Sequence, residues 1–357
     1  MSTRLKRPAT VLAYWRKEKL ICENYRTKSC TEINASTFAI LDYFGEWRSH
    51  LDCSQQFPGH PKLRLFRFLE ELVTRQLLVR EGSPEAAADE LCQEAWASWL
   101  PEAGFLHFGT RDIKYASNPE EARKIIEDLL RLKPQPPFFK TYSQAPVVVL
   151  PPATLLEADF QRVLLKRRTH RRFSPEPISL EHLSTLLQYT WGVTGFSDDP
   201  LLGRLPQKTS PSGGARHPEE VYVVALRVEG LRPGLYHYSS DRHLLECLQF
   251  EPDSEGVIAY CAGQRWIGCA AALFIMTMVL ARTMWKYPVP RGYRVALTES
   301  GHLCQTFLLV ACALELGSFC TMALNESLIE KDLDLKSFEE TIMYVAGVGV
   351  PLTSSCS

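Results

Sequence analysis

The feature that most constrains the fold of this chain is a dense run of positive charge near its middle. Residues 162–172 contain six cationic side chains, one histidine and no acid. The cations are Arg162, Lys166, Arg167, Arg168, Arg171 and Arg172. Such a run repels itself and stays solvated unless an anion neutralises it. Apolar residues on both sides, and a helix capped by Ser179 just after, predict burial, where arginine forks could hold a phosphate. An exposed basic face, or a patch for RNA or acidic lipid, is the alternative that spacing leaves open.

The order of residues within this run resembles a known cofactor motif. Arg167, Arg168, Thr169, Arg171 and Phe173 read R-R-T-x-R-x-F, which resembles the entry motif of the FMN-dependent nitroreductase superfamily. It looks most like the SagB/McbC-type branch, the dehydrogenases that oxidise azolines to azoles in peptide natural products. The resemblance implies FMN as cofactor, with Arg167, Arg168, Thr169 and Arg171 around its phosphate. Threonine stands where serine is usual and keeps the hydroxyl.

The composition points to no other class of ligand. The 357 residues carry a net charge of -1, so nothing global suggests nucleic acid or an anionic membrane. The N-terminal segment lacks the apolar core of a signal peptide. The 11 cysteines show neither a C-x-x-C pair nor zinc spacing. We therefore expect reduced cysteines, a cytoplasmic protein, and no metal, nucleic-acid or membrane partner.

The first 150 residues divide into two predicted segments. Residues 1–82 show a hairpin, two helices and a short strand, an outline typical of a winged helix. No basic stripe dominates this outline, so DNA binding is not favoured, and both a docking or dimer-supporting role and a purely structural role stay open. Residues 83–150 are interpreted as a helical connector ending in a proline-rich arm. Such arms wrap the partner subunit in the superfamily; a simple linker is the alternative.

Residues 151–357 are the predicted catalytic domain. The resemblance implies an α+β sandwich of the nitroreductase type, dimeric, with a central mixed sheet flanked by helices. A helix at 298–316, apolar nearly all round, is expected to be fully buried, to form the dimer core and to end at Gly317. The hairpin at 234–246 carries His237 and His243, which we expect to be structural.

A second motif lies about 40 residues after the arginines. Pro211, Ser212, Gly213 and Gly214 could let backbone N–H groups approach a ligand closely. Alone, this stretch is an ordinary turn. Together with residues 215–222, it closely resembles the P-S-x-G-x-x-x-P-x-E-x-Y signature of SagB-type dehydrogenases, which implies that Pro211, Ser212, Gly213 and Gly214 contact the flavin from the neighbouring subunit.

Lys286 and Tyr287 are the predicted catalytic residues. Adjacent K-Y pairs at strand ends are common surface features, but K-Y followed by R-x-Y-R resembles azoline dehydrogenases, where the pair is thought to act in proton removal. Oxidising an azoline removes a hydride and a carbon-bound proton, so a base is required. We predict Tyr287 as base, with Lys286 or Arg291 as the cation that favours its phenolate, or Lys286 itself as a desolvated base. Further flavin contacts implied by the resemblance are Arg291, Gln305, Cys320 and Thr321.

The sequence thus predicts a homodimeric FMN-dependent dehydrogenase that aromatises a thiazoline or oxazoline in a peptide, with O2 reoxidising the reduced flavin. The peptide could be nonribosomal and held on a carrier protein, or ribosomal and delivered with a cyclodehydratase. Two alternatives stay open: an NAD(P)H-dependent nitro- or quinone reductase, and a non-catalytic docking or scaffold subunit of a synthetase.

Overall fold

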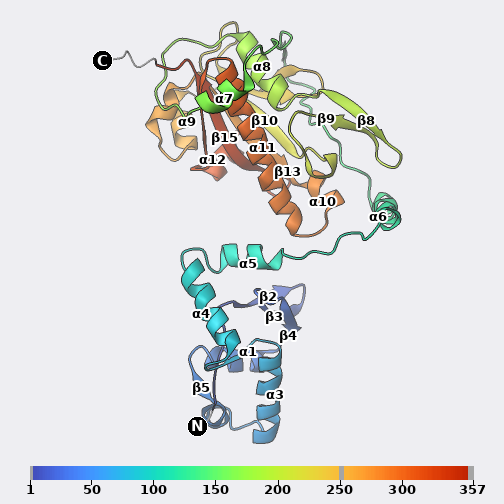
Figure 1. The fold of residues 1–357 in the computed structure, drawn as a ribbon, viewed down its shortest axis with the longest axis vertical. Coiled ribbons are helices and arrows are strands. Elements are labelled where there is room, and N and C mark those ends of the chain that lie inside the picture. Colours follow the sequence, from blue (N-terminus) through green and yellow to red (C-terminus); the bar gives the residue numbers. More distant parts are fainter. Residues whose placement is uncertain (1–2, 249–252, 353–357) are drawn as a thin grey trace. The chain divides into compact units, whose positions relative to one another are not determined.

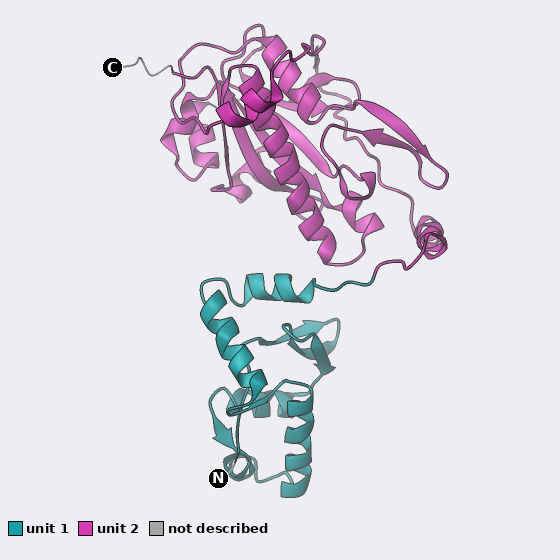
Figure 2. Cartoon of the chain, in the orientation of Figure 1, with its two compact units in different colours: residues 1–114 teal, residues 115–357 magenta. Residues whose placement is uncertain are grey.

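The computed structural model describes residues 3–248 and 253–352, which fall into two compact units (Figures 1 and 2). Unit 1 comprises residues 1–114 and unit 2 residues 115–357. The stretch from 83 to 150, predicted as one connector, is shared between them. We describe each unit by itself.

Unit 1 holds two small sheets with helices around them. One sheet has the order β5-β1-β6 and the other the order β2-β3-β4. The strands are β1 (Arg4–Lys6), β2 (Val11–Arg16), β3 (Lys19–Asn24), β4 (Ser29–Glu32), β5 (Arg48–Ser49) and β6 (Val79–Arg80). The helices are α1 (Ala35–Tyr43), α2 (His50–Gln56), α3 (Lys62–Thr74), α4 (Pro84–Trp96) and α5 (Glu102–Gly109). The amphipathic helix α3 buries Leu65, Leu69 and Leu72, which share one face at helical spacing. The hairpin and both predicted helices are present, while the winged-helix assignment stays a prediction.

Unit 2 is built on a seven-stranded sheet with the order β14-β15-β13-β10-β11-β12-β7. The strands are β7 (Val147–Val149), β10 (Glu219–Ala225), β11 (Gly234–Ser239), β12 (Leu244–Cys247), β13 (Ala272–Val279), β14 (Gly317–Thr321) and β15 (Glu340–Gly349). All the neighbouring pairs among these described strands are antiparallel, so the predicted mixed sheet is wrong. The chain does return from β13 to β14 in the same direction, but β15 lies between the two and runs opposite to both.

Helices cover both faces of this sheet (Figure 1). Alternate residues of β10 point to opposite faces, as a pleated strand requires: Val221 and Val223 join one core, Tyr222 and Val224 the other. The first core packs beneath α8 (Leu180–Thr190) and α11 (Arg291–Ala313), and the second beneath α9 (Ser254–Tyr260) and α12 (Glu326–Asp332). The remaining elements are α6 (Pro119–Leu132), α7 (Phe160–Lys166), the hairpin β8 (Gly195–Asp199) and β9 (Gly203–Gln207), the short helices η1 (Gly213–Ala215) and η2 (Arg265–Cys269), and α10 (Leu280–Lys286).

Helix α11 differs from its prediction in both bounds and burial. It begins seven residues before Thr298, and His302 and Gln305 are exposed, so the expectation of full burial is wrong. Its end is not formed by Gly317, which begins β14. Glu315 takes the left-handed conformation (φ 60°), and the N–H groups of Glu315 and Leu316 bond to the carbonyls of Cys312 and Ala311, a Schellman motif. In the described part of the chain, α11 is the one helix long and apolar enough to cross a membrane, a property also typical of a core helix.

The proline-rich stretch after α6 is held by its own unit. Trp285 Nε1 donates to the Lys133 carbonyl at 3.1 Å, and Arg282 Nε donates to the Pro137 carbonyl at 2.8 Å. Lys140 Nζ lies 2.6 Å from the Glu340 carboxylate. These contacts hold the stretch on unit 2, and its predicted wrapping of a partner subunit stays a prediction.

His237 and His243 both make side-chain hydrogen bonds within unit 2, of the kind expected for structural residues. His237 is fully buried, with its two ring nitrogens 2.8 Å from Glu246 and 3.1 Å from Glu220. His243 lies 2.8 Å from the hydroxyls of Tyr238 and Ser184.

Replacement of Gly347 by alanine tests the tight packing of the β14–β15 pair. A Cβ at Gly347 would lie 2.3 Å from Phe319 Cζ. We expect Gly347→Ala to destabilise unit 2 by about 1–3 kcal/mol, lowering its melting temperature by several degrees in a calorimetric scan. Gly301→Ala is the control, because a Cβ there meets nothing within 4 Å and alanine favours the helix by about 1 kcal/mol. Equal melting temperatures for the two variants would contradict this packing.

Candidate active site

Lys286 and Tyr287 pack against the glycine loop, which we define as residues 211–214. Lys286 is the last residue of α10 and Tyr287 is its C-cap, so the pair ends a helix and not a strand. Lys286 Nζ donates to the Gly214 carbonyl at 3.1 Å. The predicted catalytic pair and the glycine loop therefore form one site within a single chain.

Neither Gly213 nor Gly214 could carry a Cβ without a clash with a neighbouring side chain. Gly214 has φ 65°, and a Cβ there would lie 2.6 Å from Tyr287 Oη and 2.7 Å from Lys286 Cδ. A Cβ on Gly213 would lie 2.4 Å from Val295 Cγ1 on α11. The sequence suggested that the glycines make room for a ligand. In the structure they make room for the side chains of Lys286, Tyr287 and Val295.

Burial shifts the two catalytic candidates in opposite directions, because it disfavours the charged form of each. Burial lowers the pKa of the Lys286 ammonium, and the nearby Arg216 lowers it further. Burial raises the pKa of Tyr287 by more than Arg216 lowers it. Arg216 is thus a cation that acts on Tyr287, and it does not secure the phenolate. Between the two candidates, the electrostatics favour Lys286 as the base.

Arg216 is a site residue that sequence reasoning missed. It is 1% exposed, and its guanidinium carbon lies 4.7 Å from the centroid of the Phe138 ring and 5.4 Å from that of Trp285. Its Nε donates to the Gly214 carbonyl at 3.1 Å, the same acceptor that Lys286 uses. The available signal was its position, two residues after the glycines.

Glu299 is a second site residue whose role the sequence did not indicate. This α11 side chain is 4% exposed and accepts hydrogen bonds from the Ser212 hydroxyl and the Gly213 N–H. Burial raises its pKa to about 7 in spite of those bonds. Burial also lowers the pKa of Lys208 to about 8, and the negative charge of Glu299 is one of the charges that raise it. Glu299 therefore holds the glycine loop with a charge that changes near neutral pH.

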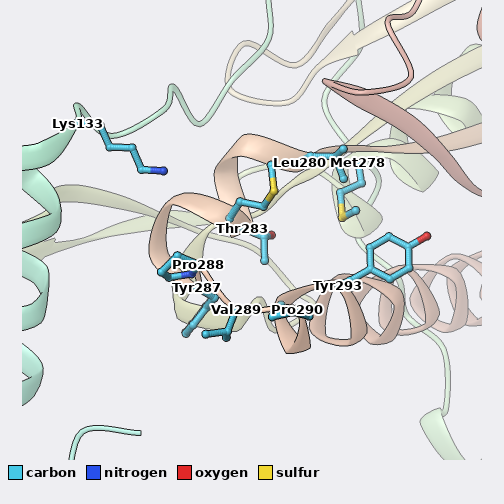
Figure 3. A pocket seen from close by; sticks show the side chains of 11 residues that line it. Lys133, Met278, Leu280, Thr283, Tyr287, Pro288, Val289, Pro290 and Tyr293 are labelled. Atoms are coloured by element: carbon cyan, nitrogen blue, oxygen red, sulfur yellow. The ribbon is translucent and has the colours of Figure 1, made fainter. Parts of the chain in front are cut away.

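A mostly apolar cavity of about 490 Å³ lies beside Tyr287 (Figure 3). Its apolar lining includes Met278, Leu280, Met284, Val289 and Tyr293, and Lys133 adds one ammonium group. The volume is in the range of small-molecule sites. An apolar group could bind here next to Tyr287.

The arginine segment, residues 162–172, is on the surface, so its predicted burial is wrong. Arg167 is half-buried, and the other five cations are exposed. Burial of six cations would need counter-charges, and among the described residues the segment has one, Glu315 at 3.4 Å from Lys166. Arg168 Nη1 donates only to backbone carbonyls, at 2.9 and 2.7 Å. Exposed guanidinium groups without a carboxylate partner fit a phosphate group such as that of FMN.

A short bridge joins this segment to the edge strand β14. Thr169 forms an isolated parallel bridge with Ser318, and the His170 N–H donates to the Ser318 carbonyl at 2.9 Å. Thr321 follows on β14, and its hydroxyl accepts from Gln264 Nε2 at 3.1 Å. The bridge thus brings the segment to Ser318, two residues before Cys320, while the flavin contacts expected of Cys320 and Thr321 stay a prediction.

The predicted site residues form two groups at different positions along α11. The glycine loop contacts α11 at Val295, and α7 contacts it at Cys312, whose Sγ lies 3.6 Å from the Val163 carbonyl. At 1.5 Å per residue these contacts are about 25 Å apart, and Figure 1 shows α10 and α7 near opposite ends of α11. Arg291 begins α11 at the end near the glycine loop. Gln305 and Pro211 are exposed.

A family model matches the part of the chain that carries both groups of site residues. The model of the nitroreductase family matches residues 164–350, more than half of the chain. The chain belongs to the nitroreductase family. The expected superfamily is therefore confirmed, and the matched range includes both groups of site residues.

Individual relatives cover this chain to different extents. A protein of Methanocaldococcus jannaschii named as a nitroreductase, MJ1384, is 31% identical over 192 residues, covering 53% of this chain and 91% of that protein. The trifolitoxin-processing protein TfxB of Rhizobium leguminosarum bv. trifolii is 32% identical over 176 residues, covering 47% of this chain and 46% of TfxB. A crystal structure of a nitroreductase-like protein from Anabaena variabilis has a TM-score of 0.50 at 20% identity, covering 68% of this chain and 49% of that one. The chain thus spans about half the length of the last two, and the structural likeness shows the fold alone.

The lowered pKa of Lys286 can be measured by amine labelling. Acetic anhydride reacts with the neutral amine, so a lowered pKa moves the onset of labelling to lower pH. We expect Lys286 to be labelled at lower pH than exposed lysines such as Lys62 in one mass-spectrometric titration. Coincident titration curves for the two lysines would contradict the shift.

Gly214→Ala tests whether the glycine loop positions Lys286. The added Cβ would collide with the side chains of Lys286 and Tyr287, so we expect the Lys286 labelling curve to move toward that of exposed lysines. Gly203→Ala is the matched control: its φ is 74°, and a Cβ there meets nothing within 4 Å. Both variants should lose about 1–2 kcal/mol from the left-handed backbone, but only Gly214→Ala should change the labelling of Lys286.

Proposed function

We propose that this chain is an FMN-dependent dehydrogenase that oxidises a thiazoline or oxazoline ring in a peptide to a thiazole or oxazole. The observation that carries the proposal is Lys286, an amine of lowered pKa held against the glycine loop beside Tyr287. Removing a carbon-bound proton needs such a base. The similarity to TfxB, named for the processing of trifolitoxin, supports a role on a peptide.

Lys286 is the proposed base, and Tyr287 a hydrogen-bond donor. With its ammonium form disfavoured by burial, Lys286 Nζ can take the ring proton as a neutral amine. Tyr287 keeps its proton because its pKa is raised, so its hydroxyl can orient a ring heteroatom. Arg216 Nε and Lys286 Nζ share the Gly214 carbonyl, which fixes the direction of the amine. FMN, when bound, would supply the acceptor for the hydride and would pass its electrons to O2.

The arginine segment and the edge of β14 are the proposed cofactor contacts. Arg167, Arg168 and Arg171 would hold the phosphate with the Thr169 hydroxyl. The backbone from Ser318 to Thr321 would lie along the flavin ring, with the glycine loop as a further contact. Gln305 and Arg291, on α11, remain proposed contacts on the resemblance alone.

We propose a homodimer in which α11 of each subunit pairs with its symmetry mate. A two-fold axis across α11 sets the helices antiparallel. The arginine segment of one subunit would then approach the glycine loop of the other, which would unite the two groups of site residues. Exposed apolar side chains on α7 accord with a buried interface: Phe160 is 68% and Leu165 67% exposed.

The partners proposed for unit 1 follow from this chemistry. We propose a cytoplasmic protein in which unit 1, as a winged-helix-like docking domain, engages a nonribosomal carrier protein, or a ribosomal precursor with its cyclodehydratase.

An NAD(P)H-dependent nitro- or quinone reductase is the second candidate function, because the family name covers that chemistry and the cavity beside Tyr287 is apolar. A non-catalytic scaffold subunit is the third.

The deciding experiment is anaerobic addition of a thiazoline-bearing peptide thioester to the purified protein, with Lys286→Ala and Tyr287→Phe as variants. We expect a flavin absorption band that bleaches while the peptide becomes two hydrogens lighter. Lys286→Ala should slow this by about 10²–10⁴-fold, as for loss of a general base, and Tyr287→Phe by less. The flavin band of each variant before substrate addition is the control for cofactor binding.

Other outcomes would replace the proposal. Bleaching by NADPH with no response to thiazoline would establish the reductase. Unchanged turnover in Lys286→Ala would remove the assigned base, and a colourless protein that still captures a carrier protein would favour the scaffold.

A further inference from the structure

Three side chains from three elements meet at the sulfur of Cys320. Tyr344 Oη donates to Cys320 Sγ at 3.2 Å. The thiols of Cys304 and Cys320 share a hydrogen bond, and the Arg167 guanidinium acts on Cys320 as a nearby positive charge. The contacts come from β15, α11 and the arginine segment. The proposed dehydrogenation uses none of these sulfur contacts.

Sheet register and helix packing explain why these groups meet. Cys320 on β14 pairs with Ala346 on β15. Tyr344 is two residues from Ala346, so it lies on the same face and is the diagonal neighbour of Cys320. That face is covered by α11, which contributes the buried Cys304. The cluster is therefore part of the core packing of unit 2, while Cys320 itself is only half-buried.

The surroundings of Cys320 are those of a stabilised thiolate. A thiol hydrogen bond from Cys304, a phenol hydrogen bond from Tyr344 and the charge of Arg167 lower the pKa of Cys320 below that of an ordinary thiol, against the opposing effect of burial. The same contacts raise the pKa of Cys304 and, after burial, that of Tyr344. One cysteine is thus the nucleophile and the other stays protonated.

We propose that Cys304 and Cys320 form a two-cysteine redox site, in which hydrogen peroxide oxidises Cys320 and Cys304 then closes a disulfide with it. In the first step the Cys320 thiolate attacks peroxide, the O–O bond breaks, and a sulfenic acid and hydroxide form. In the second step the Cys304 sulfur displaces the sulfenic oxygen as water while its own proton is lost. Overall two thiols lose two electrons and two protons, and peroxide becomes two waters.

The first arm of the test is the pH dependence of alkylation of the full-length protein by iodoacetamide. We expect Cys320 alkylation to be half-maximal at a clearly lower pH than the value of about 8.5 typical of an ordinary thiol, because its contacts lower its pKa. Cys304→Ala and Tyr344→Phe should each raise the midpoint, because each removes a hydrogen-bond donor to the thiolate. Cys269→Ser, which alters an exposed thiol elsewhere, should leave it unchanged. A wild-type midpoint near that of an ordinary thiol would overturn the proposal.

The second arm identifies the products of one equivalent of hydrogen peroxide by peptide mapping without reduction. Wild type should give a Cys304–Cys320 cross-link. Cys304→Ala should stop at a Cys320 sulfenic acid, trapped as its dimedone adduct. Cys320→Ala should leave Cys304 as a thiol. Oxidation of Cys269 with Cys320 still reduced would reject the site. Neither arm uses catalytic turnover, so failure here is separate from failure of the proposed dehydrogenase.

Discussion

The packing of α11 across one face of the antiparallel sheet is the interaction on which both halves of the candidate site depend. Its buried face carries Leu303 and Phe307 into the core beside Trp191 and Phe274. Near its start, Val295 and Glu299 support the glycine loop, and near its end Cys312 contacts α7. A displacement of this helix would therefore disturb the glycine loop and the arginine segment together, although neither touches the other within the chain.

Local patterns in the sequence predicted local structure well. The helical connector predicted within residues 83–150 contains α6, and the hairpin predicted at 234–246 is formed by β11 and β12. These elements depend on capping residues and periodicity, which a single stretch contains. The antiparallel order around β15 could not be derived in this way, because it depends on which strands meet after a long crossover. The helix end at Glu315 was missed because a favourable glycine stood two residues further on.

The site residues also divide into those that local motifs could locate and those that depend on the tertiary structure. Motif order located the glycine loop and the Lys286–Tyr287 pair, and the structure places them in contact. It could not locate Glu299, which reaches the loop from a helix more than 80 residues away. The fact that Lys286 and Tyr287 are neighbours in the sequence also could not decide which of the two side chains keeps its proton. That depends on burial, which disfavours charge on both and so moves an amine and a phenol in opposite directions.

The bridge between Thr169 and Ser318 has a consequence for the integrity of the sheet. β14 is an edge strand, and edge strands expose unpaired backbone groups that can recruit strands of other molecules. The chain from Thr169 to Ser174 covers part of this edge, with backbone bonds to Ser318 and Val350. The charged segment thus also shields the fold from intermolecular strand pairing. Loss of colour or solubility on mutating its arginines would then report an opened sheet edge as readily as loss of the proposed phosphate contact.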